Sequence, residues 1–206
     1  MVIHSQGTPE QFSMTQADKR RRILDAAVQV FATYGFYNSK VSQVAREAGV
    51  ADGTIYLYFK NKDDILIQLF NDSMAEILRR QDAALATVTA PIERIQTFIK
   101  THFESVAESQ AMAEVVTVEL RQSSKFMRNT DMKPFGRYLS MIAEIIADGV
   151  ASGDFGDVPP RVAARAIFGA IDELALEWAM GKRRGSLEDA CHATTNFFLD
   201  GLRSRP

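Results

Sequence analysis

The sequence has few of the features that would cross-link the chain by disulfide bonds, anchor it in a membrane or direct its export. It contains one cysteine among 206 residues, Cys191, which excludes an internal disulfide bond and suits a reducing compartment. No apolar run approaches the roughly 20 residues of a transmembrane helix. Residues 1–14 are polar and lack the apolar core of a signal peptide, so we expect a disordered arm there. We therefore predict a cytoplasmic protein without membrane association, in which Cys191 is a small buried side chain and nothing supports a redox role.

Catalytic and metal-binding patterns are also missing. The three histidines, His4, His102 and His192, are scattered, and no spacing of His, Cys, Asp or Glu matches a zinc or facial-triad site. There is no glycine-rich phosphate loop after a strand and no nucleophile elbow. The acidic pair Asp172-Glu173 could suggest a general acid or base, but no nucleophile or metal cluster accompanies it, so helix capping, ligand gating or ion pairing is preferred. We predict that the chain is not an enzyme and has no metal or cofactor.

Charge is divided unevenly along the chain. Residues 1–62 carry 8 lysines and arginines against 5 acidic residues, a net charge of +3, whereas the remainder carries 16 against 21. A basic N-terminal module on an acidic body is typical of a protein that binds nucleic acid at one end.

Residues 41–66 have the pattern of a helix-turn-helix. Small apolar residues spaced as in a helix run from Val41 to Ala48, and Gly49 supplies a turn. A second helix is expected to open at Asp52, an N-cap type of residue, and to continue to Tyr58. In such an arrangement the second helix lies in the major groove of DNA.

Hydroxyl and ammonium groups gather on this second helix and just after it, where they suit phosphate oxygens and base edges. The predicted DNA-binding residues of the whole motif are Lys40, Ser42, Gln43, Asp52, Gly53, Thr54, Tyr56, Tyr58 and Lys62. A helical hairpin with solvated tyrosines is the alternative interpretation. The basic cluster at residues 19–22 lies in the first turn of a helix, where cations are unfavourable, so it is either a phosphate contact or a solvated charge run.

The remaining chain predicts helices only. Thr15 or Asp18 can cap a first helix that ends near Gly35, and Ser39 can cap the next. Later helices are expected over residues 63–86, 91–108, 134–152, 160–178 and 187–202, with a mixed apolar segment at 112–122 and Ser186 as the last cap. The predicted fold is all-α, with a helix-turn-helix DNA-binding domain of three helices at residues 15–62 and a helical ligand-binding and dimerisation domain at 63–206.

The last two expected helices carry small or apolar residues on more than one side. Such positions include Ala166 and Phe168 in one helix and Phe197 and Gly201 in the other. A helix with two apolar faces must bury both, so one face is expected to pair with a second subunit. A homodimer also suits a two-fold symmetric, double-stranded DNA operator.

The helix-turn-helix resembles that of the TetR family of bacterial repressors. The matching positions are Phe31, Gly35, Val44, Ala45, Ala48, Gly49, Val50, Gly53, Thr54, Ile55, Tyr56, Phe59, Lys62 and Leu66. Residues 49–62, 118–123 and 167–173 further resemble the TetR-type fatty-acid-degradation regulators, the FadR branch. This resemblance implies a fourth helix that transmits ligand binding to the DNA-binding domain, and a repressor that long-chain acyl-CoA releases from its operator.

An acyl chain needs an apolar tunnel with few polar anchors. The residues predicted to line it are Phe70, Met74, Phe98, Phe103, Val116, Leu120, Leu139, Ile142, Phe168, Ile171 and Trp178. Arg121, Lys125, Arg128 and Lys133 are predicted to contact the phosphates of CoA, since they form the dense basic patch of the acidic body. Ordinary core and surface charges are the alternative interpretations of the two sets.

Two other functions stay open at this point. One is a repressor of the same family whose effector is another hydrophobic small molecule, as in multidrug or metabolite efflux control. The other is an enzyme or lipid carrier that merely contains a helix-turn-helix, which would bind ligand without sequence-specific, salt-dependent DNA affinity.

Overall fold

The computed structural model describes residues 15–116, 133–181 and 185–203. Within these ranges every regular element is a helix, and the one β-type pairing is an isolated bridge between Phe155 and Arg203. The prediction of an all-α fold is confirmed. None of the helices in these ranges combines the length and apolar character needed to span a bilayer.

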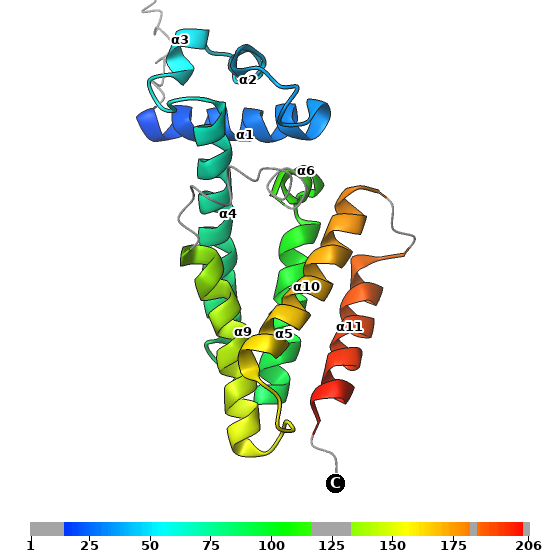
Figure 1. Ribbon diagram of the computed structural model, residues 1–206. Helices are drawn as coiled ribbons and strands as arrows, with labels where there is room; N and C mark the ends of the chain where they lie inside the picture. Colours follow the sequence, from blue (N-terminus) through cyan, green and yellow to red (C-terminus); the bar gives the residue numbers. More distant parts are fainter. Residues whose placement is uncertain (1–14, 117–132, 182–184, 204–206) are drawn as a thin grey trace, which may run out of the picture.

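Three helices at one end of the molecule form a small domain, here called the head (Figure 1): α1 (Gln16–Tyr34), α2 (Val41–Glu47) and α3 (Asp52–Ile55). All three contribute to its core, which includes Ile23, Ala27, Phe31, Val44, Ala45, Ile55 and Phe59. α1 begins at a capping box in which the Thr15 hydroxyl accepts from the Asp18 N–H and the Asp18 carboxylate accepts from the Thr15 N–H, each at 3.1 Å. Both residues predicted as caps therefore take part.

Two other predicted caps in the head are wrong. The Ser39 hydroxyl donates to the C-cap carbonyl of α1 at 2.6 Å, and Lys40 occupies the N-cap position of α2. The side chain of Gln43 accepts there instead, from the Lys40 N–H at 2.7 Å. Asp52 lies inside α3 rather than at its N-cap, and α3 ends at Ile55, three residues before the predicted end. The chain continues from it as a turn.

The helix α4 (Lys62–Leu85) connects the head to the rest of the molecule without a break, and its bounds differ by one residue from those predicted (Figure 1). Its first turns belong to the core of the head, through Ile65, Leu66 and Leu69. From Phe70 and Met74 onward it packs in a second core. One continuous helix therefore contributes to both cores.

The second core belongs to the body, which consists of α4 together with α5 (Pro91–Ala107), α6 (Gln110–Glu114), α9 (Lys133–Ser152), α10 (Pro160–Ala179) and α11 (Leu187–Leu202). Prolines at the first positions of α5 and α10 fit there because the first N–H groups of a helix have no intrahelical partner. Ser186 caps α11 as predicted, through a capping box with Asp189. In Figure 1, α10 crosses in front of α5, α9 lies beside the lower part of α4, and α11 lies at the side.

The short helix α6 connects the body to the head. Ala111 and Met112 pack on the core of the head, and Val115 is fully buried in it. On its other side the Gln110 amide donates to the carbonyl of Ala179, at the end of α10, at 3.0 Å. α6 covers part of the apolar segment predicted at 112–122, whose residues from 117 lie outside the described ranges.

Candidate DNA-reading surface and ligand chamber

The turn between α2 and α3 has the geometry of a helix-turn-helix. Gly49 adopts φ +63°, a left-handed conformation that L side chains rarely take, and the Val50 N–H bonds the Ala45 carbonyl at 2.9 Å. A Cβ atom at Gly49 would lie 2.5 Å from the guanidinium of Arg22. Arg22, one of the basic cluster of residues 19–22, therefore packs against the turn.

Apart from Lys62, the first residue of α4, the predicted DNA-binding residues lie on or directly next to α2 and α3, at the free end of the head (Figure 1). Tyr56 is 58% exposed, and the other exposed members are Lys40, Ser42, Asp52 and Gly53. Gln43, Thr54 and Tyr58 are half-buried. The structure thus brings these side chains to one end of the molecule, where DNA contact stays a prediction.

Leu57 is a candidate contact that the sequence analysis missed. It is 80% exposed, although it stands between residues that face inward, Ile55 and Phe59. An apolar side chain at the tip of a reading surface can meet the methyl group of thymine. The sequence did contain this information. In a helix, a residue that is two positions from each of two inward-facing residues points outward.

Lys62, another predicted DNA-binding residue, makes hydrogen bonds within the head. Its ammonium donates to three backbone carbonyls, those of Phe36 at 2.5 Å, Tyr37 at 3.2 Å and Ser39 at 2.8 Å. It also lies 4.5 Å from the centroid of the Phe36 ring. An ammonium has three N–H donors, so these bonds use all of them. Lys62 fastens the connection between α1 and α2 to the start of α4, which favours a structural role, and a phosphate contact by this residue stays a prediction.

Arg20 also makes its polar contacts within the protein. Its guanidinium donates to Asp72 and to Gln68 of α4, at 3.0 Å each, and lies 5.9 Å from the centroid of the Phe59 ring. Of the basic cluster at residues 19–22, Arg20 thus joins α1 to α4. This pairing accounts for a cation at the start of α1 without invoking DNA.

Nine of the ten apolar ligand-binding predictions within the described ranges share one cluster in the body. Phe70, Met74, Phe98, Phe103, Ile142 and Ile171 are its buried members, and Val116, Phe168 and Trp178 pack against it. Leu139 is half-buried on α9 and is not part of that cluster. Leu120, Arg121, Lys125 and Arg128 lie outside the described residues, and Lys133 is exposed at the start of α9.

A polar pair inside this cluster was not predicted. Nδ1 of His102, on α5, lies 2.8 Å from the hydroxyl of Tyr138, on α9, and both side chains are buried. Burial lowers the pKa of His102 to about 4, an effect partly offset by the backbone of Ile171, and it raises the pKa of Tyr138 well above its usual range. Both groups are therefore neutral near pH 7. Because the two residues are 36 positions apart along the chain, sequence analysis could not pair them.

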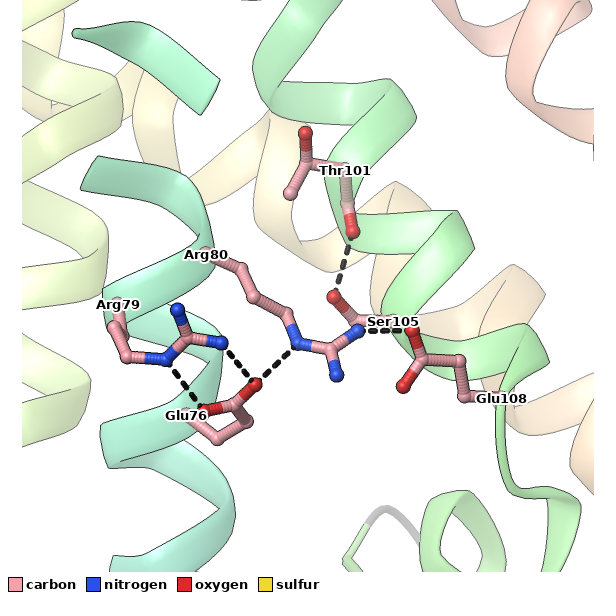
Figure 2. Close-up of polar contacts among 6 residues, drawn as sticks. All are labelled: Glu76, Arg79, Arg80, Thr101, Ser105 and Glu108. Atoms are coloured by element: carbon pink, nitrogen blue, oxygen red, sulfur yellow. Dashed lines mark hydrogen bonds and ion pairs between the residues drawn. The ribbon is translucent and has the colours of Figure 1, made fainter. Parts of the chain in front are cut away.

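An ion-pair network joins α4 to the end of α5. Figure 2 shows Glu76 between Arg79 and Arg80, which donate to its carboxylate at 2.7 to 2.8 Å. Hydrogen bonds from Arg79 first, and then from Arg80, lower the pKa of Glu76 to about 2. Arg80 also donates to Glu108, the C-cap of α5, so one guanidinium bridges the two helices.

A surface pocket of about 200 Å³ opens between α4, α5 and α9. Its cations are already neutralised, because Arg94 pairs with Asp148 at 2.7 Å and Arg137 pairs with Glu144 at 2.8 Å. This pocket is therefore poorly suited to bind a phosphate group, because carboxylates already pair with its two arginines. Among the described residues no three side chains of His, Cys, Asp or Glu gather as they would to hold a metal ion. Burial raises the pKa of Cys191, which disfavours the reactive thiolate.

Comparison with known proteins covers both parts of the chain. The family model for bacterial regulatory proteins of the tetR family matches residues 23–69, and that for the C-terminal region of YsiA-like proteins matches residues 70–201. The fatty acid metabolism regulator protein of Bacillus subtilis is 36% identical over 188 residues, which are 91% of this chain and 97% of that protein.

Two solved structures are similar throughout. The fatty acid degradation regulator FadR from Bacillus halodurans has a TM-score of 0.84 at 35% identity, over 93% of this chain and 100% of that one. FadR from Bacillus subtilis in complex with stearoyl-CoA has a TM-score of 0.81 at 36% identity, over 89% of this chain and 99% of that one.

Proposed function

The chain belongs to the TetR family of bacterial regulatory proteins, and we propose that it represses genes of fatty-acid degradation until long-chain acyl-CoA releases it from a palindromic operator. The observation that carries this proposal is the likeness to Bacillus subtilis FadR, which was crystallised with stearoyl-CoA and aligns over 89% of this chain. That alignment includes the body, where an effector must bind. The apolar cluster of α4, α5, α9 and α10 supports it, since an acyl chain needs such surroundings.

DNA binding in this proposal belongs to the free end of the head. Exposed Tyr56 and half-buried Thr54, on and just after α3, supply hydroxyls for base edges and phosphates, while Lys40 supplies a cation at the start of α2. Ser42, Gln43, Asp52, Gly53 and Tyr58 complete the proposed surface.

The functional unit in this proposal is a homodimer paired through α10 and α11. Phe197, on α11, is 73% exposed, and Val162, on α10, is also exposed. Large apolar side chains on neighbouring helices favour burial against another subunit. Gly201 adds an open position, because a Cβ atom built there meets nothing within 4 Å. Two heads in one dimer then match two half-sites separated by about 34–36 Å or a multiple.

Release follows from linkage between the two sites. We assume that acyl-CoA binds better to a dimer geometry in which the heads no longer fit both half-sites. Bound acyl-CoA then lowers the affinity for the operator, and bound operator lowers the affinity for acyl-CoA by the same factor. Two connections in this chain suit such coupling. α4 enters both cores, and α6 touches the head on one side and α10 on the other.

The phosphates of CoA are assigned in this proposal to Arg121, Lys125 and Arg128, with Lys133 at the start of α9. Arg121→Ala should weaken acyl-CoA binding more than fatty-acid binding, because a fatty acid lacks the phosphates. Equal losses for the two ligands would remove Arg121 from the site.

The test of the proposed function is a titration of operator-bound protein with acyl-CoAs of several chain lengths. The fluorescence anisotropy of labelled operator reports how much DNA is released at each step. Long-chain acyl-CoA should release the DNA, whereas free CoA at the same concentration should not. Native mass spectrometry of the protein purified from cells should show an acyl-CoA mass. Release by another hydrophobic compound, with no response to any acyl-CoA, would assign a different effector.

A further inference from the structure

The pair His102 and Tyr138 is a polar position inside an otherwise apolar wall. Phe98 lies 4.9 Å from the Tyr138 ring, and Phe103 lies 5.6 Å from the His102 ring, measured between ring centroids. Phe168, on α10, also stands 6.0 Å from Tyr138. All five belong to the apolar cluster or lie within it, so this pair faces the residues proposed to surround an acyl chain.

One atom of the pair is left without a partner. Nε2 of His102 is fully buried and makes no hydrogen bond to any residue in the described ranges. The backbone of Ile171 lies close enough to raise the pKa of His102 as a weak hydrogen-bond partner would, but the contact does not reach the distance and angle of a full hydrogen bond to Nε2. A buried polar atom without a partner costs about 1–3 kcal/mol, so a protein that retains one usually uses it.

The position of the ring proton follows from counting donors and acceptors. If the Tyr138 hydroxyl donates to Nδ1, the neutral imidazole carries its proton on Nε2, and one donor remains unmatched. The other tautomer would leave two unmatched functions, an Nε2 acceptor and the Tyr138 hydroxyl proton. We therefore assign the proton to Nε2, with Tyr138 holding the ring in that tautomer.

We propose that the Nε2–H of His102 donates a hydrogen bond to the thioester carbonyl oxygen of a bound acyl-CoA. This inference rests on the proposed function and adds to it a residue that determines ligand specificity. The thioester carbonyl is the one hydrogen-bond acceptor next to the apolar tail, so a single neutral donor in an apolar wall matches it. A free fatty acid would instead place a carboxylate charge beside two neutral groups, which burial disfavours.

The experiment compares two ligands that differ only at this carbonyl, stearoyl-CoA and the thioether S-octadecyl-CoA, in which a methylene group replaces C=O. Isothermal titration calorimetry on the full chain should show that the parent protein binds the thioester about tenfold more tightly, the value of one hydrogen bond. His102→Phe should bind both ligands equally. Tyr138→Phe should reduce the preference, because the imidazole is no longer held in one tautomer.

Phe103→Leu is the matched control. It alters the apolar wall beside the imidazole without touching a polar group, so it should weaken both ligands by the same factor and keep the tenfold preference. Tyr138→Phe removes a single oxygen atom, and it decides the matter if His102→Phe does not fold.

Each outcome separates this inference from the proposed function. Equal binding of both ligands by the parent protein, or a preference that survives in both His102→Phe and Tyr138→Phe, would overturn the role of His102 while acyl-CoA remained the effector. Failure of the parent protein to bind either ligand would overturn the proposed function itself.

Discussion

The ammonium of Lys62, the first residue of α4, donates to the carbonyl oxygen of Phe36 at 2.5 Å and lies over the ring of the same residue. The ammonium also donates to the carbonyls of Tyr37 and Ser39. The connection between α1 and α2 is thereby fastened to the helix that leads into the body. A side chain expected at a DNA phosphate serves the internal geometry of the head.

Lys62→Met should lower the free energy of unfolding by about 2 kcal/mol, because it leaves three carbonyls without their charged donor. Urea denaturation measures the effect. The matched control is Lys60→Met, whose side chain is exposed and which should change stability by less than about 0.5 kcal/mol. If Lys62→Met reduces the salt dependence of operator binding at unchanged stability, the phosphate role returns.

Tyr56→Ala should weaken operator binding about tenfold or more, since it removes an exposed hydroxyl and ring from the proposed reading surface. Acyl-CoA binding should stay unchanged, because Tyr56 belongs to the head and the effector site to the body. Anisotropy with labelled operator and calorimetry with stearoyl-CoA check the two halves of this prediction. Operator affinity equal to that of the parent protein would remove Tyr56 from the surface.

Arg80→Gln should weaken the coupling between effector and operator while changing stability by less than about 1 kcal/mol, because its pair with Glu108 is partly exposed. The quantity to measure is the ratio of operator dissociation constants with and without acyl-CoA. Arg79→Gln is the matched control, since Arg79 pairs with Glu76 within α4 and does not bridge the two helices. A ratio that falls equally in both variants would argue against the bridge as a coupling element.

The ion pairs of Glu76 with Arg79 and Arg80 should persist at mildly acidic pH. The Arg79 and Arg80 hydrogen bonds hold the pKa of Glu76 near 2, well below its ordinary value of 4.5. Its contribution is therefore complete above about pH 4.5 and is lost only as the pH falls towards 2. The coupling ratio at pH 4.5, where a carboxylate of ordinary pKa is half protonated, should therefore equal the ratio at pH 7.

His102 should make the protein sensitive to acid in a different range. Its pKa is about 4 in the folded chain and 6.5 ordinarily, so the unfolded chain takes up a proton first as the pH falls. The free energy of unfolding should therefore decrease between pH 6.5 and 4, by roughly 3 kcal/mol at most. Urea denaturation across this range should show a smaller decrease in His102→Phe. Tyr138→Phe keeps the imidazole and should keep the decrease.

Phe197→Glu should convert the proposed dimer into monomers, because it places a charge on the most exposed large apolar side chain of α11. Sedimentation velocity measures the association state, and circular dichroism should show unchanged helix content. Operator affinity should fall sharply, since one head then meets one half-site. A dimer that persists with full operator affinity would place the interface elsewhere.

Local sequence signals predicted the helices well. Pro91, Pro160 and Ser186 mark helix starts because their preferences act within one turn of chain. Ser39 failed as a cap for the opposite reason. The Ser39 hydroxyl finds a carbonyl at the end of α1, an acceptor that no reading of α2 alone can include.

By itself the sequence determined the all-α fold, the helix-turn-helix and the family, since these depend on periodicity, capping and local residue type. The tertiary structure alone decided which polar groups are used internally. Lys62 meets carbonyls 23 to 26 residues away, Arg20 meets Asp72, and His102 meets Tyr138. The physical reason is that hydrogen bonds and ion pairs depend on distances of about 3 Å between atoms far apart along the chain, and packing, rather than residue type, sets those distances.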